Sequence, residues 1–378
     1  MRIAVITSGF ARDENETGGA AALHNFVKML SLSPDIEITV FTMYWPHDRK
    51  EYDYFGAKVY SFAEKQKNNK WDKLRIWRNL NSKFGEIHKT KPFELIQALW
   101  LGEPGYTAAG LSKKHNIPLV AAVCGGELAA IESINYGSRL SFRQNYFVTK
   151  ALEQSKIVIA GSDFIVNKLK QVYNGKFYYK AKKIPFGVDE NVFSPGRGNE
   201  ARTGLNLINI ANCVPVKAHE DLFKAVKLVK EKFPAVTLTC CGRDDDNLMP
   251  GLVKKYGLEE NVKLMGIIDH TDIPFILSNS DIFVLSSLYE SENVSMIEAA
   301  FCGLPVVSTK VGVADEITPY ISEPGDFKQL AEKIISVITD YENIRKISEE
   351  KVTDFLKIFS LAESTSRFLE LYKKILKH

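Results

Sequence analysis

Two carboxylates, Glu290 and Glu298, lie on either side of a predicted loop-to-helix junction. The apolar run 282–285 predicts a short buried strand, and a helical pattern begins at Ser295 and ends before Gly303. The start of such a helix offers unpaired N–H donors and the positive end of the helix dipole to an anion such as a phosphate. Eight helical residues rise about 12 Å, the length from a ribose across a pyrophosphate to a sugar. One carboxylate could therefore hold each end of a nucleotide-diphosphate sugar.

A purely structural role is the competing hypothesis for the same residues. Ser295 followed three residues later by Glu298 forms a capping box, which stabilises the start of any helix. Glu290, considered alone, is equally compatible with a solvated loop charge. Ligand binding and helix capping both remain open at this point.

The segment from Glu290 through Glu298 to the run CGLPVVST resembles the donor-site signature of glycosyltransferase family four, whose members are retaining enzymes of GT-B fold. The resemblance implies that Glu290 lies against the transferred sugar and that Glu298 holds the ribose hydroxyls. It implies further that backbone amides at the start of the helix meet the pyrophosphate, namely those of Asn293, Val294 and Ser295. Where the family has an aromatic-glycine pair, this chain has Glu292-Asn293, so we expect a less free backbone and an added negative charge near the phosphates.

The remaining donor-site candidates precede this segment in the sequence. Lys217 occupies the lysine position of the family's Arg-to-Lys pair and can supply a point charge to the donor phosphates. The arginine position is Asn212, so one charge-assisted contact is missing. By resemblance we expect Glu290 and Lys217 to be catalytic. Two glycines at strand ends, and two residues whose backbone is expected to contact the nucleotide base, complete the set: Gly242, Gly266, Ile267 and Ile268.

Two glycine-containing turns in the first half of the chain are candidates for the opposite side of the site. Gly18-Gly19 precedes a predicted helix, where close backbone approach and helix N–H groups suit a phosphate, although an ordinary flexible turn has the same pattern. The run Cys124-Gly125-Gly126-Glu127 resembles a family segment of type His-Gly-x-Asp or His-Gly-x-Glu on the acceptor side. Glu127 fits the acidic position, whereas Cys124 replaces the histidine. A buried cysteine before a glycine turn is the alternative for Cys124.

Apolar runs typical of buried strands alternate with helical patterns along the whole chain, which predicts parallel sheets covered on both faces. A length of 378 residues suits two domains. We expect an α/β protein of GT-B fold, with two Rossmann-like doubly wound domains facing a central cleft. The expected boundaries are an acceptor-side domain at 1–198, a donor-binding domain at 199–360, and a last helix at 361–378 that crosses back to the first domain.

Composition narrows the class of protein. A net charge of +3 is too small to indicate a nucleic-acid partner, and no apolar run approaches the 18 residues of a membrane span. The five cysteines show no metal-ligand spacing and are expected to be reduced, so we expect a cytoplasmic protein. No Asp-x-Asp pair ends a strand. We therefore expect no metal ion and no other cofactor, with the helix start and Lys217 stabilising the leaving diphosphate.

The segment 65–91 carries nine basic and two acidic residues, a net charge of +7. Its apolar side chains recur at helical spacing, at Trp71, Leu74, Trp77, Leu80 and Phe84. An ordinary amphipathic helix packed against the first domain explains this pattern. The alternative is a surface helix that attaches the protein peripherally to an anionic membrane, since cations and tryptophan favour that interface.

The leading function is transfer of a sugar from a nucleotide-diphosphate sugar, with retention of configuration, to a sugar or lipid-linked acceptor such as a polysaccharide precursor. One alternative is a nucleotide-sugar 2-epimerase, which shares the architecture and the donor. A second is an inactive donor-binding relative, suggested by Asn212 and Cys124. The sequence leaves the sugar, the base and the acceptor open.

Overall fold

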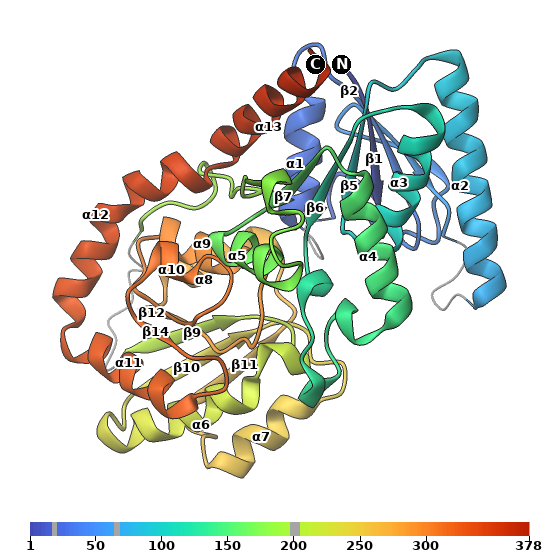
Figure 1. Cartoon of the computed structure of the whole chain (residues 1–378). Coiled ribbons are helices and arrows are strands. Elements are labelled where there is room, and N and C mark those ends of the chain that lie inside the picture. Colours follow the sequence, from blue (N-terminus) through green and yellow to red (C-terminus); the bar gives the residue numbers. More distant parts are fainter. Residues whose placement is uncertain (17–20, 64–68, 197–204, 378) are drawn as a thin grey trace. The chain divides into compact units, whose positions relative to one another are not determined.

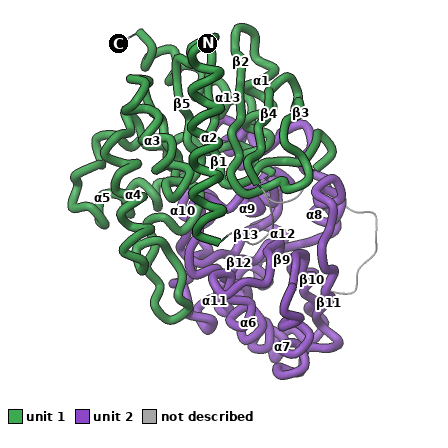
Figure 2. Tube along the Cα trace, turned by 90° about the vertical axis from the view of Figure 1, so that its right-hand side faces the viewer, with its two compact units in different colours: residues 1–187, 361–378 green, residues 188–360 purple. Residues whose placement is uncertain are grey.

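The protein is described here from a computed structural model, which covers residues 1–16, 21–63, 69–196 and 205–377 (Figure 1). Contacts divide the chain into two compact units, coloured separately in Figure 2. Unit 1 comprises Met1–Gly187 and Leu361–His378, and unit 2 comprises Val188–Ser360. The second unit thus begins at Val188 and not at the expected residue 199. The reason is local, because the Val188 N–H donates to the Phe359 carbonyl (2.9 Å) and both side chains belong to the core of unit 2.

Unit 1 is built on an eight-stranded sheet of order β3-β4-β2-β1-β5-β6-β7-β8. Its neighbouring strands are parallel except for the pair β3 and β4, which is antiparallel. The strand bounds are β1 (Arg2–Thr7), β2 (Glu37–Thr42), β3 (Glu51–Tyr54), β4 (Ala57–Ser61), β5 (Leu95–Leu99), β6 (Leu119–Val123), β7 (Ile157–Ala160) and β8 (Ala181–Lys183).

Helices cover both faces of this sheet. In Figure 1, α1 and α13 lie side by side on one face, and α2, α3 and α4 lie on the other. The helix bounds are α1 (Ala21–Ser31), α2 (Lys70–Thr90), α3 (Glu103–His115), α4 (Phe142–Gln154), α5 (Asp163–Val172) and α13 (Leu361–Leu376), with short 3-10 turns η1 (Gly126–Leu128), η2 (Glu132–Ile134), η3 (Ser138–Leu140) and η4 (Tyr178–Lys180).

Helix α2 corresponds to the basic segment 65–91, of which residues 65–68 lie outside the described residues. Asn69 caps it by accepting the N–H groups of Trp71 and Asp72. The predicted single apolar stripe is only partly correct. Leu80 and Phe84 are buried, but Trp71 is 77% exposed and Leu74 is 46% exposed. The helix therefore packs through its later turns, while its first turn presents apolar side chains to solvent.

Helix α13 lies against unit 1 through aromatic packing. The Phe368 ring lies 4.5 Å from that of Phe26 and 5.9 Å from that of Phe186, measured between centroids. The Tyr372 hydroxyl donates to Gln97 Oε1 (2.8 Å) on β5, and Tyr372 is fully buried. This buried hydrogen bond satisfies both polar groups inside an otherwise apolar core.

Unit 2 is built on a six-stranded, all-parallel sheet of order β11-β10-β9-β12-β13-β14. The strand bounds are β9 (Asn206–Ile210), β10 (Thr237–Cys241), β11 (Val262–Gly266), β12 (Ile282–Leu285), β13 (Val306–Thr309) and β14 (Ile321–Ser322). The helix bounds are α6 (His219–Lys232), α7 (Leu248–Tyr256), α8 (Ile273–Ser278), α9 (Val294–Phe301), α10 (Ala314–Ile317), α11 (Phe327–Thr339) and α12 (Tyr341–Phe359), with 3-10 turns η5 (Pro215–Lys217) and η6 (His270–Asp272).

Successive residues of the buried strands serve opposite faces of the unit 2 sheet, as the two-residue repeat of a strand requires. Phe283 and Leu285 join the core formed with α9, α10 and α12, whereas Ile282 and Val284 join the core formed with α6, α7 and α11. Both faces are thus covered, which confirms the expected pair of Rossmann-like doubly wound domains. Because the strands are parallel, the connections that leave β9, β10, β11 and β12 meet at one edge of the sheet.

Substitution of Phe368 tests how strongly α13 stabilises unit 1. Phe368→Ala removes a fully buried ring and is expected to lower the free energy of unfolding by about 3–5 kcal/mol. Urea denaturation followed by tryptophan fluorescence measures this, because all four tryptophans (Trp45, Trp71, Trp77 and Trp100) belong to unit 1. Lys373→Ala, an exposed change on the same helix, should cost less than about 0.5 kcal/mol. An unaltered transition in Phe368→Ala would contradict this role.

Candidate active site

The junction between β12 and α9 has the predicted strand-loop-helix form. Helix α9 begins at Val294, and its N-cap is Asn293, whose Oδ1 accepts the Met296 N–H (2.9 Å). The capping box expected from Ser295 and Glu298 is therefore wrong, because Ser295 already lies inside the helix. Asn293 has φ 74°, a left-handed conformation that asparagine tolerates better than most residues. The first helical N–H groups, of Val294 and Ser295, have no acceptor within the helix.

The turn after β13 holds this loop in place through the backbone. Val313 N–H donates to the Glu292 carbonyl (3.0 Å). Gly312 makes the approach possible, since a Cβ at this position would lie 2.3 Å from the same carbonyl oxygen. Replacement of the family's aromatic-glycine pair by Glu292-Asn293 thus still allows a left-handed turn, and Glu292 itself is buried. The loop is shaped by a backbone contact between two connections of the sheet.

The two residues expected to be catalytic lie in direct contact. Lys217 Nζ lies 2.6 Å from Glu290 Oε1, and the Ser287 hydroxyl donates to the same oxygen (2.7 Å). Both charged side chains are mostly buried, with exposed fractions of 23% for Lys217 and 12% for Glu290. A partly buried ion pair is screened less by solvent than one on the surface. The pair therefore joins the connection after β9 to the connection after β12.

Backbone hydrogen bonds fix the position of Lys217 relative to the Glu290 loop. The Ser286 hydroxyl donates to the Lys217 carbonyl (2.8 Å), and the Leu288 N–H donates to the Val216 carbonyl (2.7 Å). The turn itself ends at Ala218, which has φ 49° and precedes α6. The ammonium of Lys217 is therefore presented from a braced backbone to the loop that leads into α9.

Glu298 faces a different part of the same sheet edge. Its Oε1 lies 2.7 Å from His270 Nε2, and only 5% of its side chain is exposed. Burial lowers the pKa of His270, but the hydrogen bond and the charge of Glu298 outweigh burial and raise this pKa above its ordinary value. His270 was not among the predicted site residues, because it follows β11 in an ordinary polar turn and belongs to no motif.

Structural contacts explain the residue types at three of the predicted donor-site positions, Asn212, Gly242 and Gly266. Asn212 Oδ1 accepts the Arg243 N–H (2.9 Å), so this amide links the connections after β9 and β10. A Cβ at Gly242 would lie 2.1 Å from the Ala211 carbonyl oxygen, and the Gly242 N–H donates to the Gly266 carbonyl (2.8 Å). Gly266 has φ 67°. These contacts bring the ends of β9, β10 and β11 together.

The backbone expected to contact the base follows Gly266. Ile267 is 70% exposed and Ile268 is partly buried against the core. The exposure of Ile267 at a strand end is compatible with the predicted contact. No ligand contact of these residues has been tested, so their role stays a prediction.

The acidic run 244–246 provides no evidence for a metal site. Asp244 accepts the N–H groups of Leu248 (3.0 Å) and Met249 (2.8 Å), which stabilises the first turn of α7. Within the described residues, no group of three or more His, Cys, Asp or Glu side chains is arranged to hold a metal ion. The expected independence from metal remains a prediction.

Glu127 in unit 1 has a clear structural role. It is 3% exposed, and its carboxylate accepts the N–H groups of Leu101 (3.2 Å), Cys124 (3.1 Å) and Gly125 (2.7 Å). Burial raises the pKa of Glu127 even though these N–H groups lower it. Glu127 thus ties the turn after β5 to the turn after β6, and both turns lie at the carboxyl edge of the sheet.

The other residues predicted in unit 1 differ in their surroundings. Cys124 is only partly buried, whereas the alternative for it proposed a buried cysteine, and its thiol donates weakly to the Ala122 carbonyl (3.7 Å). A Cβ at Gly126 would lie 2.8 Å from the Tyr136 ring, which explains the glycine there. Gly18 and Gly19 lie outside the described residues.

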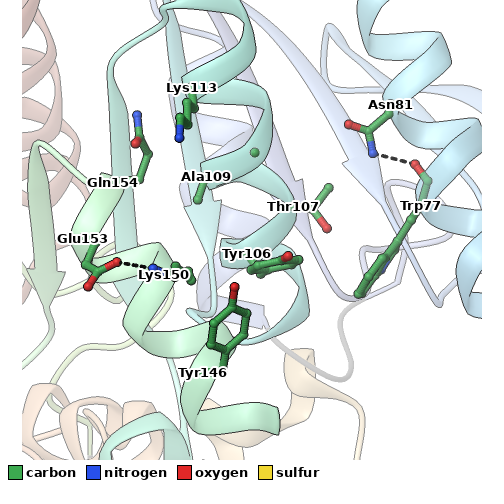
Figure 3. Close-up of a pocket in the computed structure, with 11 residues that line it drawn as sticks. Trp77, Asn81, Tyr106, Thr107, Ala109, Lys113, Tyr146, Lys150, Glu153 and Gln154 are labelled. Carbon is green, nitrogen blue, oxygen red and sulfur yellow. Dashed lines mark hydrogen bonds and ion pairs between the residues drawn. The ribbon is translucent and has the colours of Figure 1, made fainter.

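A pocket of about 430 Å³ lies among α2, α3 and α4 (Figure 3). Its lining includes the rings of Trp77, Tyr106 and Tyr146, and the ion pair of Lys150 with Glu153 (2.8 Å). The Tyr106 and Tyr146 rings lie 6.0 Å apart between centroids. Apart from Trp77, the sequence analysis singled out none of these residues, because they converge only when three helices pack together.

The His270–Glu298 pair predicts a pH-dependent stability. Because the folded-state pKa of His270 is raised, the stabilisation is fully present below the unfolded-state pKa of about 6.5 and is lost as pH rises through the folded-state value. His270→Gln should therefore lower the unfolding free energy more at pH 5.5 than at pH 9. Urea denaturation followed by circular dichroism measures this difference. In a protein that already carries Glu298→Gln, His270→Gln should change the unfolding free energy equally at both pH values. A pH-independent effect of His270→Gln alone would contradict the assignment.

Comparison with known proteins identifies relatives of this arrangement. Residues 194–353 match the family model of the glycosyl transferases of group 1. A phosphatidylinositol N-acetylglucosaminyltransferase protein of Arabidopsis thaliana is 27% identical over 205 residues, which are 52% of this chain and 45% of that protein. The N-acetyl-alpha-D-glucosaminyl L-malate synthase of Bacillus anthracis is 25% identical over 317 residues, 79% of each chain. The match therefore spans less than half of the first relative and about four fifths of the second.

Solved structures share the fold over the full chain. Sucrose-phosphate synthase from Thermosynechococcus elongatus aligns with a TM-score of 0.79 at 16% identity, covering 100% of this chain and 99% of that one. The Anabaena protein HepE in complex with UDP-glucose aligns with a TM-score of 0.75 at 19% identity, covering 99% of this chain and 100% of that one. These matches confirm the GT-B fold. The resemblance to glycosyltransferase family four is thereby confirmed, and residues 194–353 are the part of the chain that matches the glycosyl transferases of group 1.

Proposed function

We propose that this protein is a retaining glycosyltransferase that moves a sugar from a nucleotide-diphosphate sugar to an acceptor hydroxyl. The observation that carries the proposal is the ion pair of Lys217 with Glu290, a residue of the loop that leads into α9. A cation, a carboxylate and unpaired helix N–H groups meet there at the carboxyl edge of a parallel sheet, where open α/β folds bind nucleotides. The names of the curated relatives, which describe N-acetylglucosaminyl transfer, support the same reaction class.

The charges suggest how the leaving group is stabilised. A diphosphate at the α9 N-terminus would compete with Glu290 for the Lys217 ammonium, and the helix N–H groups would stabilise the remaining negative charge. Glu290, released from Lys217 in part, would then turn its carboxylate to the sugar. There it orients a hydroxyl and stabilises the positive charge that develops at the anomeric carbon.

The bond changes follow from retention of configuration. The bond from the anomeric carbon to the phosphate oxygen breaks, and its electron pair leaves with the diphosphate. The acceptor oxygen attacks the same face, and its proton passes to the departing phosphate. Glu298, buried and held by His270, is assigned to the ribose hydroxyls, because a fixed carboxylate there can accept both of them.

We assign the acceptor to unit 1, at the connections that follow β5 and β6. The finer proposal is a sugar or lipid-linked acceptor of polysaccharide synthesis. The names of the relatives include both phosphatidylinositol and L-malate, so family membership alone does not choose between a lipid and a soluble acceptor.

Glu290→Gln tests the proposed function. The amide preserves the hydrogen bond to Ser287 but loses the charge, so we expect donor binding to be kept and turnover to fall by about 100- to 1000-fold. A thermal-shift panel of nucleotide sugars identifies the donor, and product analysis by NMR gives the anomeric configuration. Incubation with donor alone distinguishes the epimerase, which converts the donor without an acceptor.

A matched control is available on the surface of the same unit. Glu220→Gln replaces a carboxylate paired with Lys255 (2.6 Å) outside the site and should leave turnover unchanged. Near-normal transfer by Glu290→Gln, or inversion at the anomeric carbon, would overturn the proposed mechanism. Intact nucleotide binding without any turnover in the original chain would favour the inactive donor-binding relative.

We further propose that unit 1 contacts an anionic membrane surface peripherally. No helix in the described ranges is both long enough and apolar enough to cross a bilayer. The candidate contact is narrower than the whole segment 65–91, because the apolar side chains Ile76, Leu80 and Phe84 of α2 are buried. It consists of the exposed side chains Trp71, Leu74 and Phe142, the last of which is 90% exposed.

Sedimentation with vesicles tests this contact. We expect binding to vesicles of anionic phospholipid at low salt, weakened in the double variant Trp71→Ser with Phe142→Ser, since each apolar group inserted and each nearby cation contributes about 1 kcal/mol. Leu248→Ser changes a 52% exposed apolar side chain of unit 2 and serves as the control. Protein that remains in the supernatant, or equal binding of all variants, would exclude this attachment.

A further inference from the structure

A carboxylate in unit 1 is contacted by two cations. Glu103 is the first residue of α3, and only 7% of its side chain is exposed. Lys73 Nζ lies 3.1 Å from its Oε1 and 3.3 Å from its Oε2, while Arg143 lies 3.2 Å from Oε1. The Tyr44 hydroxyl donates to Oε2. Burial raises the pKa of Tyr44, and this hydrogen bond raises it further. The four side chains come from four separate segments of the chain.

These residues lie at the carboxyl edge of the unit 1 sheet. Tyr44 follows the end of β2, and Glu103 follows the end of β5. A Cβ at Gly102 would lie 3.6 Å from Gln144 Oε1, so the start of α4 lies over the same turn. Ligands of open α/β sheets bind outside this edge. The cluster is therefore placed where unit 1 would receive an acceptor.

The balance of charge and exposure points to an oxyanion ligand. The carboxylate is covered, whereas the side chains of Lys73 and Arg143 are 33% and 56% exposed. Among the residues that the structure describes, neither cation contacts a second carboxylate. Guanidinium and ammonium groups carry eight N–H donors between them, more than the two oxygens of Glu103 can accept.

A role in stability alone accounts poorly for this arrangement. One cation is enough to neutralise Glu103, and the second adds repulsion between like charges and restricts another long side chain. An incoming oxyanion would relieve that repulsion and accept the unused donors. Arg143 is also held by packing over the Phe147 ring, at 5.2 Å from its centroid, so its guanidinium is partly preorganised.

We propose that Lys73 and Arg143, held over Glu103, bind an oxyanion of the acceptor, either a phosphate ester or a carboxylate. This inference rests on the proposed function, because it assigns the negatively charged group to the acceptor of that reaction. It requires no turnover to be tested, since binding of the anion alone is measurable.

Tryptophan fluorescence provides a readout specific to unit 1. Trp45 and Trp71 are close in sequence to Tyr44 and Lys73, and Trp100 precedes Glu103 by three residues. Trp100 has φ 69°, unusual for a large side chain, and its Nε1 would lie 3.5 Å from a Cβ at Gly125. Unit 2 contains no tryptophan, so an anion bound at the donor site is not detected directly.

The experiment titrates the whole protein with glycerol 3-phosphate, succinate and neutral glycerol. We expect a saturable fluorescence change with at least one of the anions and none with glycerol; the preferred anion distinguishes a phosphate from a carboxylate acceptor. Arg143→Gln and Lys73→Gln should each weaken this binding by roughly tenfold, as for loss of a charge-assisted hydrogen bond. Arg143→Lys should restore part of it.

Lys83→Gln is the matched control, because Lys83 lies on the same helix as Lys73 and pairs with Glu86 (2.8 Å) away from the cluster. It should bind the anion as the original chain does, and circular dichroism should show all variants folded. Absence of saturable binding of both anions overturns the inference, as does unaltered affinity in folded Lys73→Gln and Arg143→Gln. A protein that binds the anion but transfers no sugar would instead refute the proposed function alone.

Discussion

The contact between Lys217 and Glu290 is the interaction on which the candidate donor site depends. Lys217 follows β9 and Glu290 follows β12. They meet because the carboxyl ends of parallel strands lie at one edge of the sheet. Ser286 and Leu288 bond the backbone of the same two connections, and Gly312 lets a third connection approach the loop closely. The charged pair is thus held by backbone geometry, as the proposed exchange of Glu290 for a phosphate at Lys217 would require.

Departures from the family pattern become understandable at this edge. Asn212 lacks the charge of arginine but bonds the backbone of Arg243, so it organises neighbouring strand ends. Asn293 adopts the left-handed conformation of a glycine and caps α9 as well. Asn212 carries no charge. Lys217 is therefore the remaining cation of the pair that the family pattern assigns to the donor phosphates. Donor affinity should therefore depend strongly on this residue and on the α9 N-terminus.

In unit 1 as well, buried charged side chains lie at the carboxyl edge of the sheet, but there they are the carboxylates Glu127 and Glu103. Glu127 uses its buried carboxylate to hold three backbone N–H groups, which makes it a part of the scaffold. Glu103 follows β5 and is covered by Lys73 and Arg143, whose remaining N–H donors lie near solvent. The two acids lie at the same edge of the sheet, yet among the described residues only Glu103 of the two is paired with cationic side chains. An acceptor with a negative charge would match this edge.

The sequence by itself determined the local elements and the reaction class. The alternation of apolar runs and helical patterns predicted the parallel sheets, and the expected last helix at 361–378 is α13 (Leu361–Leu376). The Glu290-to-Glu298 spacing pointed to the family because that motif is contiguous. Only the tertiary structure decided which residues meet: Lys217 with Glu290, His270 with Glu298, and Glu103 with its two cations. It also decided that unit 2 begins at Val188 and that Trp71 and Leu74 of α2 are exposed. The physical reason is that periodicity reports which face of one element is apolar, whereas contacts between distant residues depend on strand order and on the connections between strands.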